Sequence, residues 1–172
     1  MDAKVSAGER SRTFSWKDPM PSASLARTLP GIEFLQGIRD RKIPNPPITD
    51  TLDYDLTVVE PGFVVFEIEP KEFHYNPIGM VHGGVALTLM DSAMSCAVQT
   101  MLPAGTVYTT LELKVNLVRA VTSKSGLMRA EGKIVHSGAR IATAEGRFVD
   151  KDGKLYAHGT TTCFIMQAEQ KK

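Results

Sequence analysis

The chain has 172 residues, of which 42% are hydrophobic and 23% charged, and its formal net charge is +1. This length and composition fit one domain of ordinary size and exclude fibrous and disordered proteins. The small net charge gives no electrostatic case for nucleic acid as a partner. A membrane partner and export are not expected, since the sequence contains neither a long apolar run nor a signal-peptide core.

The N-terminal quarter of the chain is predicted to lie outside the main domain. Residues 1–20 are polar and predict a flexible tail. A helix is expected over 22–41, where apolar side chains recur on one face. The proline-rich residues 44–47 should end that helix. We therefore expect an N-terminal helix and linker over 21–47 and the main domain over 48–168.

Two strands are predicted next, over 52–59 and 63–69, joined as a hairpin by the turn Pro61-Gly62. The second strand is expected to continue through 73–75. The pair Asn76-Pro77 then predicts a turn that redirects the chain.

Residues 83–101 are dense in Ala, Leu and Met and predict one long helix that is apolar on most sides. Because a carboxylate is costly to bury, Asp91 in the middle of this helix is a candidate functional residue. The alternative is a structural carboxylate hydrogen-bonded to Thr88 or Ser95. One narrow polar stripe is expected on this helix, made of Thr88, Asp91, Ser92, Ser95 and Gln99.

The rest of the chain predicts antiparallel strands. Polar and apolar residues alternate over 109–117, and this parity places Thr109 on the apolar face. Further strands are expected over 126–136, 140–150 and 154–166, linked by hairpin turns. A sheet with a single, largely apolar helix should curl around it, so the fold class is α+β. Cys96 and Cys163 lie in apolar stretches and indicate free thiols in a reducing compartment, so a cytoplasmic protein is expected.

The order of these elements and one spaced motif resemble the hotdog-fold acyl-CoA thioesterases, in particular the phenylacetate-pathway (PaaI-like) branch. Residues 108–116 and 157–163 are also similar to that branch, and the resemblance covers roughly residues 50–166. It implies a curved antiparallel sheet wrapped around one central helix. The motif consists of Asn76, Gly79, His82, Gly83, Gly84 and Asp91.

The resemblance implies that Asp91 is the catalytic carboxylate, as general base or as nucleophile. Gly83 opens the helix, and its free amide would stabilise an oxyanion. His82 would hydrogen-bond the carbonyl oxygen or orient the departing thiol, and the alternative is a His that fixes the loop. Asn76 would position water, unless it serves only the Asn-Pro turn. Thr109 would reach the water or Asp91, unless it is an ordinary strand residue.

Related enzymes place the site between two subunits, so the resemblance implies a homodimer and often a dimer of dimers, a homotetramer. The rise of about 12 Å from Gly83 to Asp91 along one helix is too long for both to hold one carbonyl. This distance also favours a site completed across a dimer. Arg119 and Arg140 are candidates for the coenzyme A phosphates, or else solvated surface residues. Coenzyme A is part of the substrate, so no cofactor is expected, and no metal is predicted.

The leading hypothesis is therefore hydrolysis of an acyl-CoA thioester to a free carboxylic acid and coenzyme A. A hotdog enoyl-thioester hydratase or dehydratase is the second hypothesis, which the position of Asp91 disfavours. A third is a protein that binds acyl-CoA without catalysis, for which a broken motif would be expected. The sequence does not identify the acyl group.

Overall fold

The computed structural model describes residues 8–168. Three short helices come first: α1 (Met20–Leu25), α2 (Gly31–Arg39) and α3 (Pro47–Leu52). A hairpin follows, made of β1 (Tyr54–Glu60) and β2 (Phe63–Ile68), then the short 3-10 helix η1 (Glu72–His74) and the long helix α4 (Gly83–Gln99). Four strands complete the chain: β3 (Thr106–Leu117), β4 (Met128–Ser137), β5 (Ile141–Asp150) and β6 (Leu155–Gln167).

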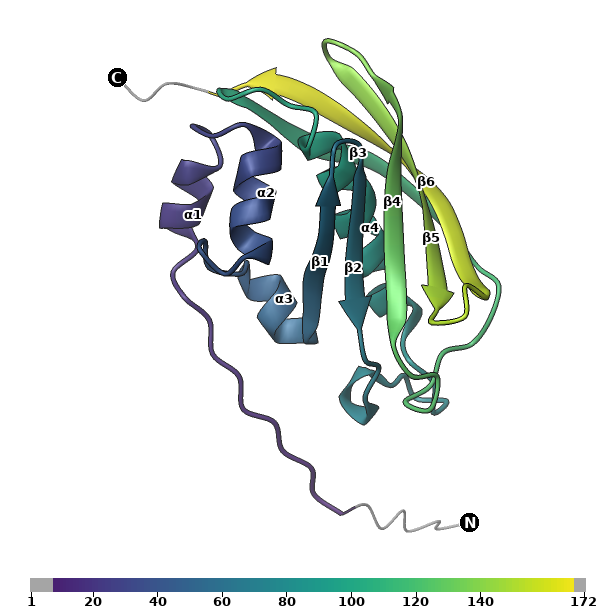
Figure 1. Cartoon of the computed structure of the whole chain (residues 1–172). Helices are drawn as coiled ribbons and strands as arrows, with labels where there is room; N and C mark the ends of the chain where they lie inside the picture. The colour runs from purple at the N-terminus through teal and green to yellow at the C-terminus, as the bar shows by residue number, and fades with distance from the viewer. Residues whose placement is uncertain (1–7, 169–172) are drawn as a thin grey trace.

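The six strands form one antiparallel sheet in the order β1-β2-β4-β5-β6-β3. The sheet curves around α4, which crosses its inner face (Figure 1). Leu89, Met90, Ala93, Met94 and Ala97 of α4 have no solvent-exposed surface. The α+β hotdog fold expected from the sequence is confirmed.

Two paired glycines, Gly132 and Gly146, let α4 approach the middle of the sheet. Gly132 pairs with Gly146 across β4 and β5, and Gly146 pairs with Gly159 across β5 and β6. A Cβ at Gly132 would collide with the backbone of Ala93, and one at Gly146 would lie 2.7 Å from Met94 Cγ. Since side chains at Gly132 and Gly146 would push the helix away, these two glycines fix the distance between α4 and the sheet.

The N-terminal helices differ from the single helix predicted over 22–41. The chain breaks after Leu25 and restarts at Gly31, because Pro30 precedes the helix in an extended conformation (φ −54°, ψ 138°). The predicted linker also ends early, since Pro47 begins α3. Proline suits a first helical turn because its missing N–H has no partner there.

Helix α2 is part of the main core, not a separate layer. Phe34, Leu35 and Ile38 are buried in the same cluster as the side chains of β1, β2 and α4. In Figure 1 the three N-terminal helices lie beside β1, at the edge of the sheet. The α2 side chains therefore cover part of the hydrophobic surface of the sheet and of α4.

The predicted tail lies partly outside the described residues, since residues 1–7 fall beyond them. Residues 8–18 contain neither helix nor strand and are exposed. Arg12 attaches this segment to the domain, because its guanidinium donates to the carbonyl oxygens of Asp50 (2.9 Å) and Thr51 (2.6 Å). No helix among residues 8–168 is long and apolar enough to cross a membrane.

The extension of β2 through 73–75 was predicted wrongly. Residues 72–74 form η1, because the His74 ring turns back onto the chain. Its Nδ1 accepts from the amide of Lys71 (3.0 Å), and its Nε2 lies 2.8 Å from the carbonyl oxygen of Leu52. A buried His therefore holds the approach to the Asn76 turn against the end of α3.

Candidate active site

His82 caps the N-terminus of α4 with its side chain. Its backbone is extended (φ −60°, ψ 132°), and its Nδ1 accepts from the amide of Gly84 at 2.9 Å. Because Nδ1 is an acceptor, the neutral ring carries its proton on Nε2, which can donate to another group. The His82 side chain therefore fixes the loop through Nδ1 and keeps its Nε2–H free to donate. The structural role and the ligand-binding role expected for His82 are thus compatible.

The amide of Gly83 has no acceptor within residues 8–168, whereas its two successors are bonded. Gly84 donates to His82 Nδ1, and Val85 donates to the carbonyl oxygen of His82. A hollow of about 360 Å³ lies beside this helix end, with His82, Gly83, Asn76, Leu117 and Arg119 among its lining residues. A free N–H at the positive end of a helix, next to a hollow, is suited to bind a developing negative charge.

Asn76 lines the same hollow but uses its side-chain oxygen within the turn. Oδ1 accepts from the amides of Ile78 (3.1 Å) and Met80 (3.2 Å), and the Asn76 amide donates to the carbonyl oxygen of Met80 (2.7 Å). The turn role expected as the alternative is thus observed. Only the Nδ2 group of Asn76 is left to contact a ligand.

Asp91 lies more than two helical turns beyond Gly83, half-buried against β3. Its Oδ1 accepts a hydrogen bond from the hydroxyl of Thr110 at 3.1 Å. The structural partners expected from the sequence bond elsewhere: Thr88 donates to the carbonyl oxygen of Gly84, and Ser95 accepts from Tyr108. The carboxylate is therefore held by a strand, not by its own helix.

The prediction that Thr109 faces inward was wrong. Thr109 is exposed, pairs with Phe164 on the outer face, and its neighbour Thr110 points to Asp91. A β-bulge is the cause: Thr110 pairs with Cys163 and Glu112 with Thr162, so Leu111 is an extra residue. An extra residue reverses which side chains face inward. The alternation seen over 111–117 therefore assigns residues before Leu111 to the wrong face. Nothing in the alternation marked this bulge, and Thr110 was missed.

The surroundings of Asp91 hold several hydroxyl and thiol groups. The Tyr54 hydroxyl lies 3.1 Å from Ser92 Oγ, and the Tyr108 hydroxyl donates to Ser95 Oγ at 3.3 Å. Burial, to which the charge of Asp91 adds, raises the pKa of Tyr54 to about 12 and that of Cys96 to about 12. These groups stay protonated at neutral pH, so Asp91 is the candidate base or nucleophile of this cluster.

The structure thus separates the candidate residues, with Thr110 in place of the predicted Thr109, into two half-sites, which we call the loop half-site and the carboxylate half-site. The loop half-site contains Asn76, His82 and Gly83; the carboxylate half-site contains Asp91 and Thr110. Strand β3 touches both, since Thr110 bonds Asp91, and a Cβ at Gly83 would lie 2.6 Å from Leu117 Cδ1. About 20 Å of β3 separates these two contacts, so one chain does not bring the half-sites together.

The two candidate phosphate-binding arginines lie at opposite ends of β6. The Arg119 guanidinium stacks over Tyr156 at 5.7 Å and lines the hollow of the loop half-site. The Arg140 guanidinium stacks over Phe164 at 5.2 Å. Eight residues of strand, about 25 Å, separate these aromatic rings, so the two arginines of one chain do not form one phosphate site.

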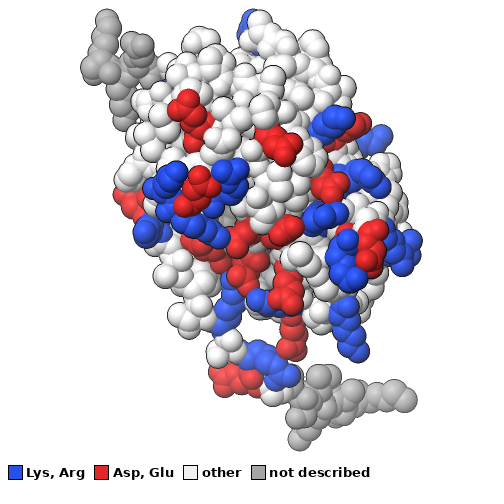
Figure 2. All heavy atoms as spheres, in the orientation of Figure 1, with Lys and Arg blue, Asp and Glu red and all other residues white. Residues whose placement is uncertain are grey.

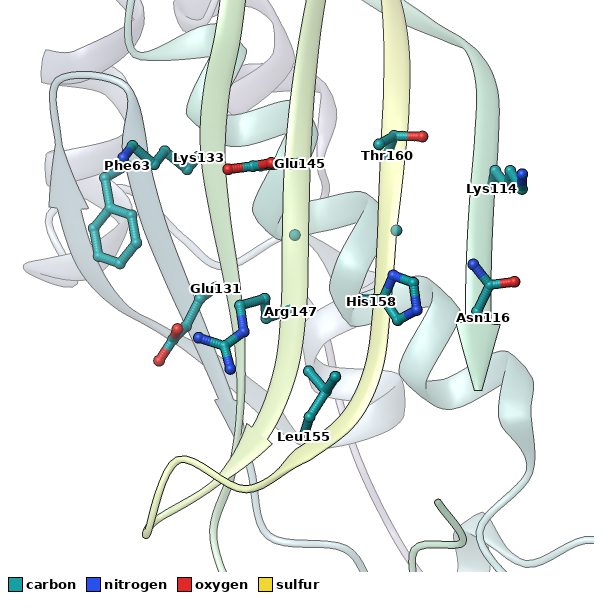
Figure 3. Close-up of a pocket in the computed structure, with 12 residues that line it drawn as sticks. Phe63, Lys114, Asn116, Glu131, Lys133, Glu145, Arg147, Leu155, His158 and Thr160 are labelled. Carbon is teal, nitrogen blue, oxygen red and sulfur yellow. The ribbon is translucent and has the colours of Figure 1, made fainter. Parts of the chain in front are cut away.

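A larger hollow, about 590 Å³, lies on the outer face of the sheet and contains none of these residues. Its charged side chains oppose each other across the strands, with Glu131 facing Arg147 and Lys133 facing Glu145 (Figure 3). Figure 2 shows charges of both signs interspersed over the visible face. Such cross-strand pairs are typical of a solvated sheet face. No three His, Cys, Asp or Glu side chains cluster as metal ligands would among residues 8–168.

Comparisons with known proteins agree with this fold and motif. The family model of the thioesterase superfamily matches residues 78–157. A proposed esterase of Saccharolobus solfataricus is 30% identical over 118 residues, which cover 69% of this chain and 82% of that protein. The 1,4-dihydroxy-2-naphthoyl-CoA hydrolase of Listeria monocytogenes is 25% identical over 125 residues, covering 73% of this chain and 98% of that protein.

Solved structures extend the likeness to three dimensions. A proposed thioesterase related to phenylacetic acid degradation, from Ralstonia eutropha, superposes with a TM-score of 0.68 at 25% identity, covering 76% of this chain and 98% of that one. The fold and the spaced motif define a hotdog-fold thioesterase. The chain belongs to the thioesterase superfamily, and this membership supports thioester hydrolysis as its general activity.

Proposed function

We propose that the protein hydrolyses an acyl-CoA thioester to a free carboxylic acid and coenzyme A, as a dimer in which each chain completes the partner's site. The observation that carries this proposal is the unbonded Gly83 amide, which lies beside a hollow but far from the Asp91 carboxylate of the same chain. Thioester hydrolysis needs both an oxyanion donor and a base or nucleophile at one carbonyl.

In the proposed reaction the thioester carbonyl oxygen lies at the amide of Gly83, with His82 Nε2–H as a second donor. Asp91 removes a proton from a water that attacks the carbonyl carbon, or attacks that carbon itself and is later freed by water. Negative charge develops on the carbonyl oxygen, where the helix N-terminus stabilises it. The C–S bond then breaks, and coenzyme A leaves as a thiolate, which needs little acid assistance.

Strand β3 is the element through which a second copy can join the two half-sites. It is an edge strand of 12 residues, and it exposes 59% of Leu111 and 52% of Leu117. A long edge with exposed apolar side chains is a template for pairing with another strand. An antiparallel β3–β3 pair would extend the sheet across both chains.

We propose a register centred on Lys114, in which the bulge at Leu111 helps to bring the half-sites together. When the pairing centres on Lys114, Leu113 faces Val115 of the partner subunit, and both lie on the inner face. The extra residue Leu111 then sets Thr110 opposite Leu117 of the partner subunit. The same register therefore places Asp91 of one chain beside Gly83 of the partner subunit.

This register also accounts for the separation of the arginines. Thr109 pairs with Phe164, and the Arg140 guanidinium stacks over the Phe164 ring. In this register Thr109 lies at the end of the partner's β3, and Arg119 of the partner subunit follows that end. Arg119 of one chain and Arg140 of the partner subunit would then lie at the same end of the paired sheet. We propose that Arg119, in the hollow itself, contacts the phosphates first.

Mixing two inactive variants tests the shared site. Asp91→Asn lacks the carboxylate, and Gly83→Pro lacks the amide N–H, while proline is tolerated at a first helical position. In a re-equilibrated mixture half of the dimers are mixed, and each mixed dimer has one intact site, so about one quarter of the wild-type thiol release should return. Mixtures of Asp91→Asn with Asp91→Ala are the control and should stay inactive.

The outcomes of this experiment separate the competing readings. No recovery in the first mixture, with exchange of subunits verified by mass, would place both groups in one chain's site and contradict the proposal. Hydration of crotonyl-CoA without thiol release would favour the hydratase, and tight binding of acyl-CoA with neither reaction would favour the binder. Molecular mass in solution tests whether two such dimers associate.

A cysteine cross-link tests the register. Lys114→Cys should form a covalent dimer on mild oxidation, because residue 114 faces itself across the two-fold axis. Glu112→Cys is the matched control, since residue 112 then faces residue 116 and no disulfide should form. Efficient cross-linking by the control, and not by Lys114→Cys, would require a different register.

A further inference from the structure

An apolar cavity of about 250 Å³ lies between the N-terminal helices and α4, outside both half-sites. Its walls come from α1, α2, the linker that leads to α3, the β1–β2 hairpin and the last turns of α4. Among residues 8–168, no Asp, Glu, Lys, Arg or His lines it; the lining includes Ala23, Leu35, Ile38, Phe66, Cys96 and Gln99. An uncharged, apolar ligand group would be favoured in such a space.

The polar groups of this cavity are few and lie among apolar side chains: Ser22, Asn45, Thr49, Cys96 and Gln99. The Thr49 hydroxyl already donates to the carbonyl oxygen of Pro46 at 2.7 Å. Burial raises the pKa of the Cys96 thiol to about 12, so it stays protonated and behaves as a small hydrophobic group. Two side-chain amides line the cavity, that of Asn45 from the linker and that of Gln99 from the end of α4.

The cavity begins beside the carboxylate half-site. Phe66, which lines it, packs against the Tyr54 ring at 5.6 Å, and the Tyr54 hydroxyl lies 3.1 Å from Ser92 Oγ, next to Asp91 in the chain. Along α4, Cys96 is about 7.5 Å from Asp91 and Gln99 about 12 Å. The cavity therefore lies against the α4 turns that follow Asp91, and the N-terminal helices close its other side.

We infer that this cavity holds the acyl tail of the substrate, and that the tail is an unsubstituted chain of medium length. This inference rests on the proposed function for the reaction at Asp91. An extended chain gains about 1.2 Å per bond, so the 12 Å from Asp91 to Gln99 accommodates about ten bonds. Leu35, Ile38 and Phe66 offer no hydrogen-bond partner, so an acyl group with hydroxyls along this wall would be disfavoured.

The inference gives the N-terminal segment a role in specificity. Residues 19–49 supply most of the lining, and they precede residues 78–157, which the superfamily model matches. The length and sequence of this segment would therefore set which acyl chains bind, independently of the reacting groups. Each methylene that enters the cavity should strengthen binding about fourfold, until the chain reaches Gln99.

The test fills the cavity from its rim and measures binding and turnover separately. Ala23 is exposed on α1 and lines the cavity, so Ala23→Phe adds a ring to the cavity without replacing a buried side chain. Ser24→Phe is the matched control, because Ser24 is the next exposed residue of α1 and does not line the cavity. The probes are S-decyl-CoA and S-ethyl-CoA, thioethers that cannot be hydrolysed, together with decanoyl-CoA and acetyl-CoA.

We expect S-decyl-CoA to bind wild type at least tenfold more tightly than S-ethyl-CoA. Ala23→Phe should lose at least tenfold in S-decyl-CoA affinity and in kcat/KM for decanoyl-CoA, while Ser24→Phe and all acetyl-CoA values change by less than about twofold. Equal losses for both chain lengths, no loss in Ala23→Phe, or a preference for 1,4-dihydroxy-2-naphthoyl-CoA over decanoyl-CoA would overturn the inference. Chain-dependent binding without thiol release would contradict the proposed hydrolysis alone and leave the cavity assignment standing.

Discussion

The loop half-site and the carboxylate half-site hold their functional groups in opposite ways. In the loop half-site, backbone geometry presents the group: the Gly83 amide is free because a helix begins there, and exposed His82 caps the next position. In the carboxylate half-site, the Asp91 side chain is half-buried and held by Thr110 from another element. The donor therefore depends on local sequence, whereas the carboxylate depends on the packing of α4 against β3.

The largest expected effect is that of Asp91→Asn on the carboxylate half-site. The amide keeps the shape and can still accept from Thr110, but it cannot act as base or nucleophile. We expect kcat for acyl-CoA hydrolysis to fall by about 10³-fold, with an unchanged unfolding midpoint. Steady-state thiol release and thermal unfolding check this, and a variant that keeps more than a tenth of the wild-type rate would remove Asp91 from the reaction.

Gly83→Pro should have the next largest effect, on the loop half-site. His82 already has the extended backbone that a following proline requires, so the helix should form while the N–H is lost. We expect kcat to fall by about 10²-fold relative to Gly83→Ala. The alanine variant is the control because its Cβ meets the same Leu117 side chain yet keeps the amide; equal rates for the two variants would refute the oxyanion role.

Thr110→Val should have a moderate effect on turnover. It tests whether Thr110, which the bulge turns inward, supports Asp91. The substitution removes the hydroxyl that donates to Asp91 and keeps the branched shape, so kcat should fall about tenfold with little change in KM. Thr109→Val, on the outer face, should stay within about twofold of wild type. A larger loss of activity in Thr109→Val than in Thr110→Val would show that Thr109, as simple alternation predicts, is the residue that faces Asp91.

The smallest expected effect is a pH dependence of the unfolding free energy, which arises from His74 in the segment before the loop half-site. Burial lowers the pKa of His74 below its usual 6.5, and its carbonyl oxygen accepts from the His82 amide at 2.8 Å. Because the unfolded chain binds the proton more readily, the unfolding free energy should fall as the pH drops below about 6.5, by at most about 1.4 kcal/mol per pH unit.

Chemical denaturation of wild type and His74→Gln between pH 5 and pH 8 measures that contribution of His74. The glutamine variant should be less stable at pH 8 and should lose less stability on acidification. Identical pH profiles for the two proteins would show that His74 does not couple folding to protonation.

Local patterns predicted most of the fold because each pattern reports on its own segment. The composition of 83–101 identified α4, and turn residues located the hairpins between strands. The break at Pro30 and the start of α3 at Pro47 were missed because proline both ends helices and begins them. Only tertiary contacts decide which of these it does at a given position.

The candidate site could be predicted only as far as the motif extends. His82, Gly83 and Asp91 lie where the motif implies, on the loop and on α4. Thr110 could not be assigned, because the bulge at Leu111 depends on pairing with β6, 50 residues later in the chain. The apolar cavity likewise depends on how residues 19–49 pack against α4, which no periodicity describes.

The paired glycines of β4 and β5, Gly132 and Gly146, have a mechanical consequence for substrate selection. The backbone of Ala93 packs against Gly132, and the Met94 side chain packs against Gly146. Since neither glycine has a side chain that could change its rotamer, helix and sheet have little freedom to move apart there. The centre of α4 should therefore stay fixed relative to the sheet. Asp91, two residues before Ala93, should stay fixed with it. Adjustment to substrates of different size is then confined to the ends of the helix, beside the His82 loop and beside the N-terminal helices, while the carboxylate keeps its position.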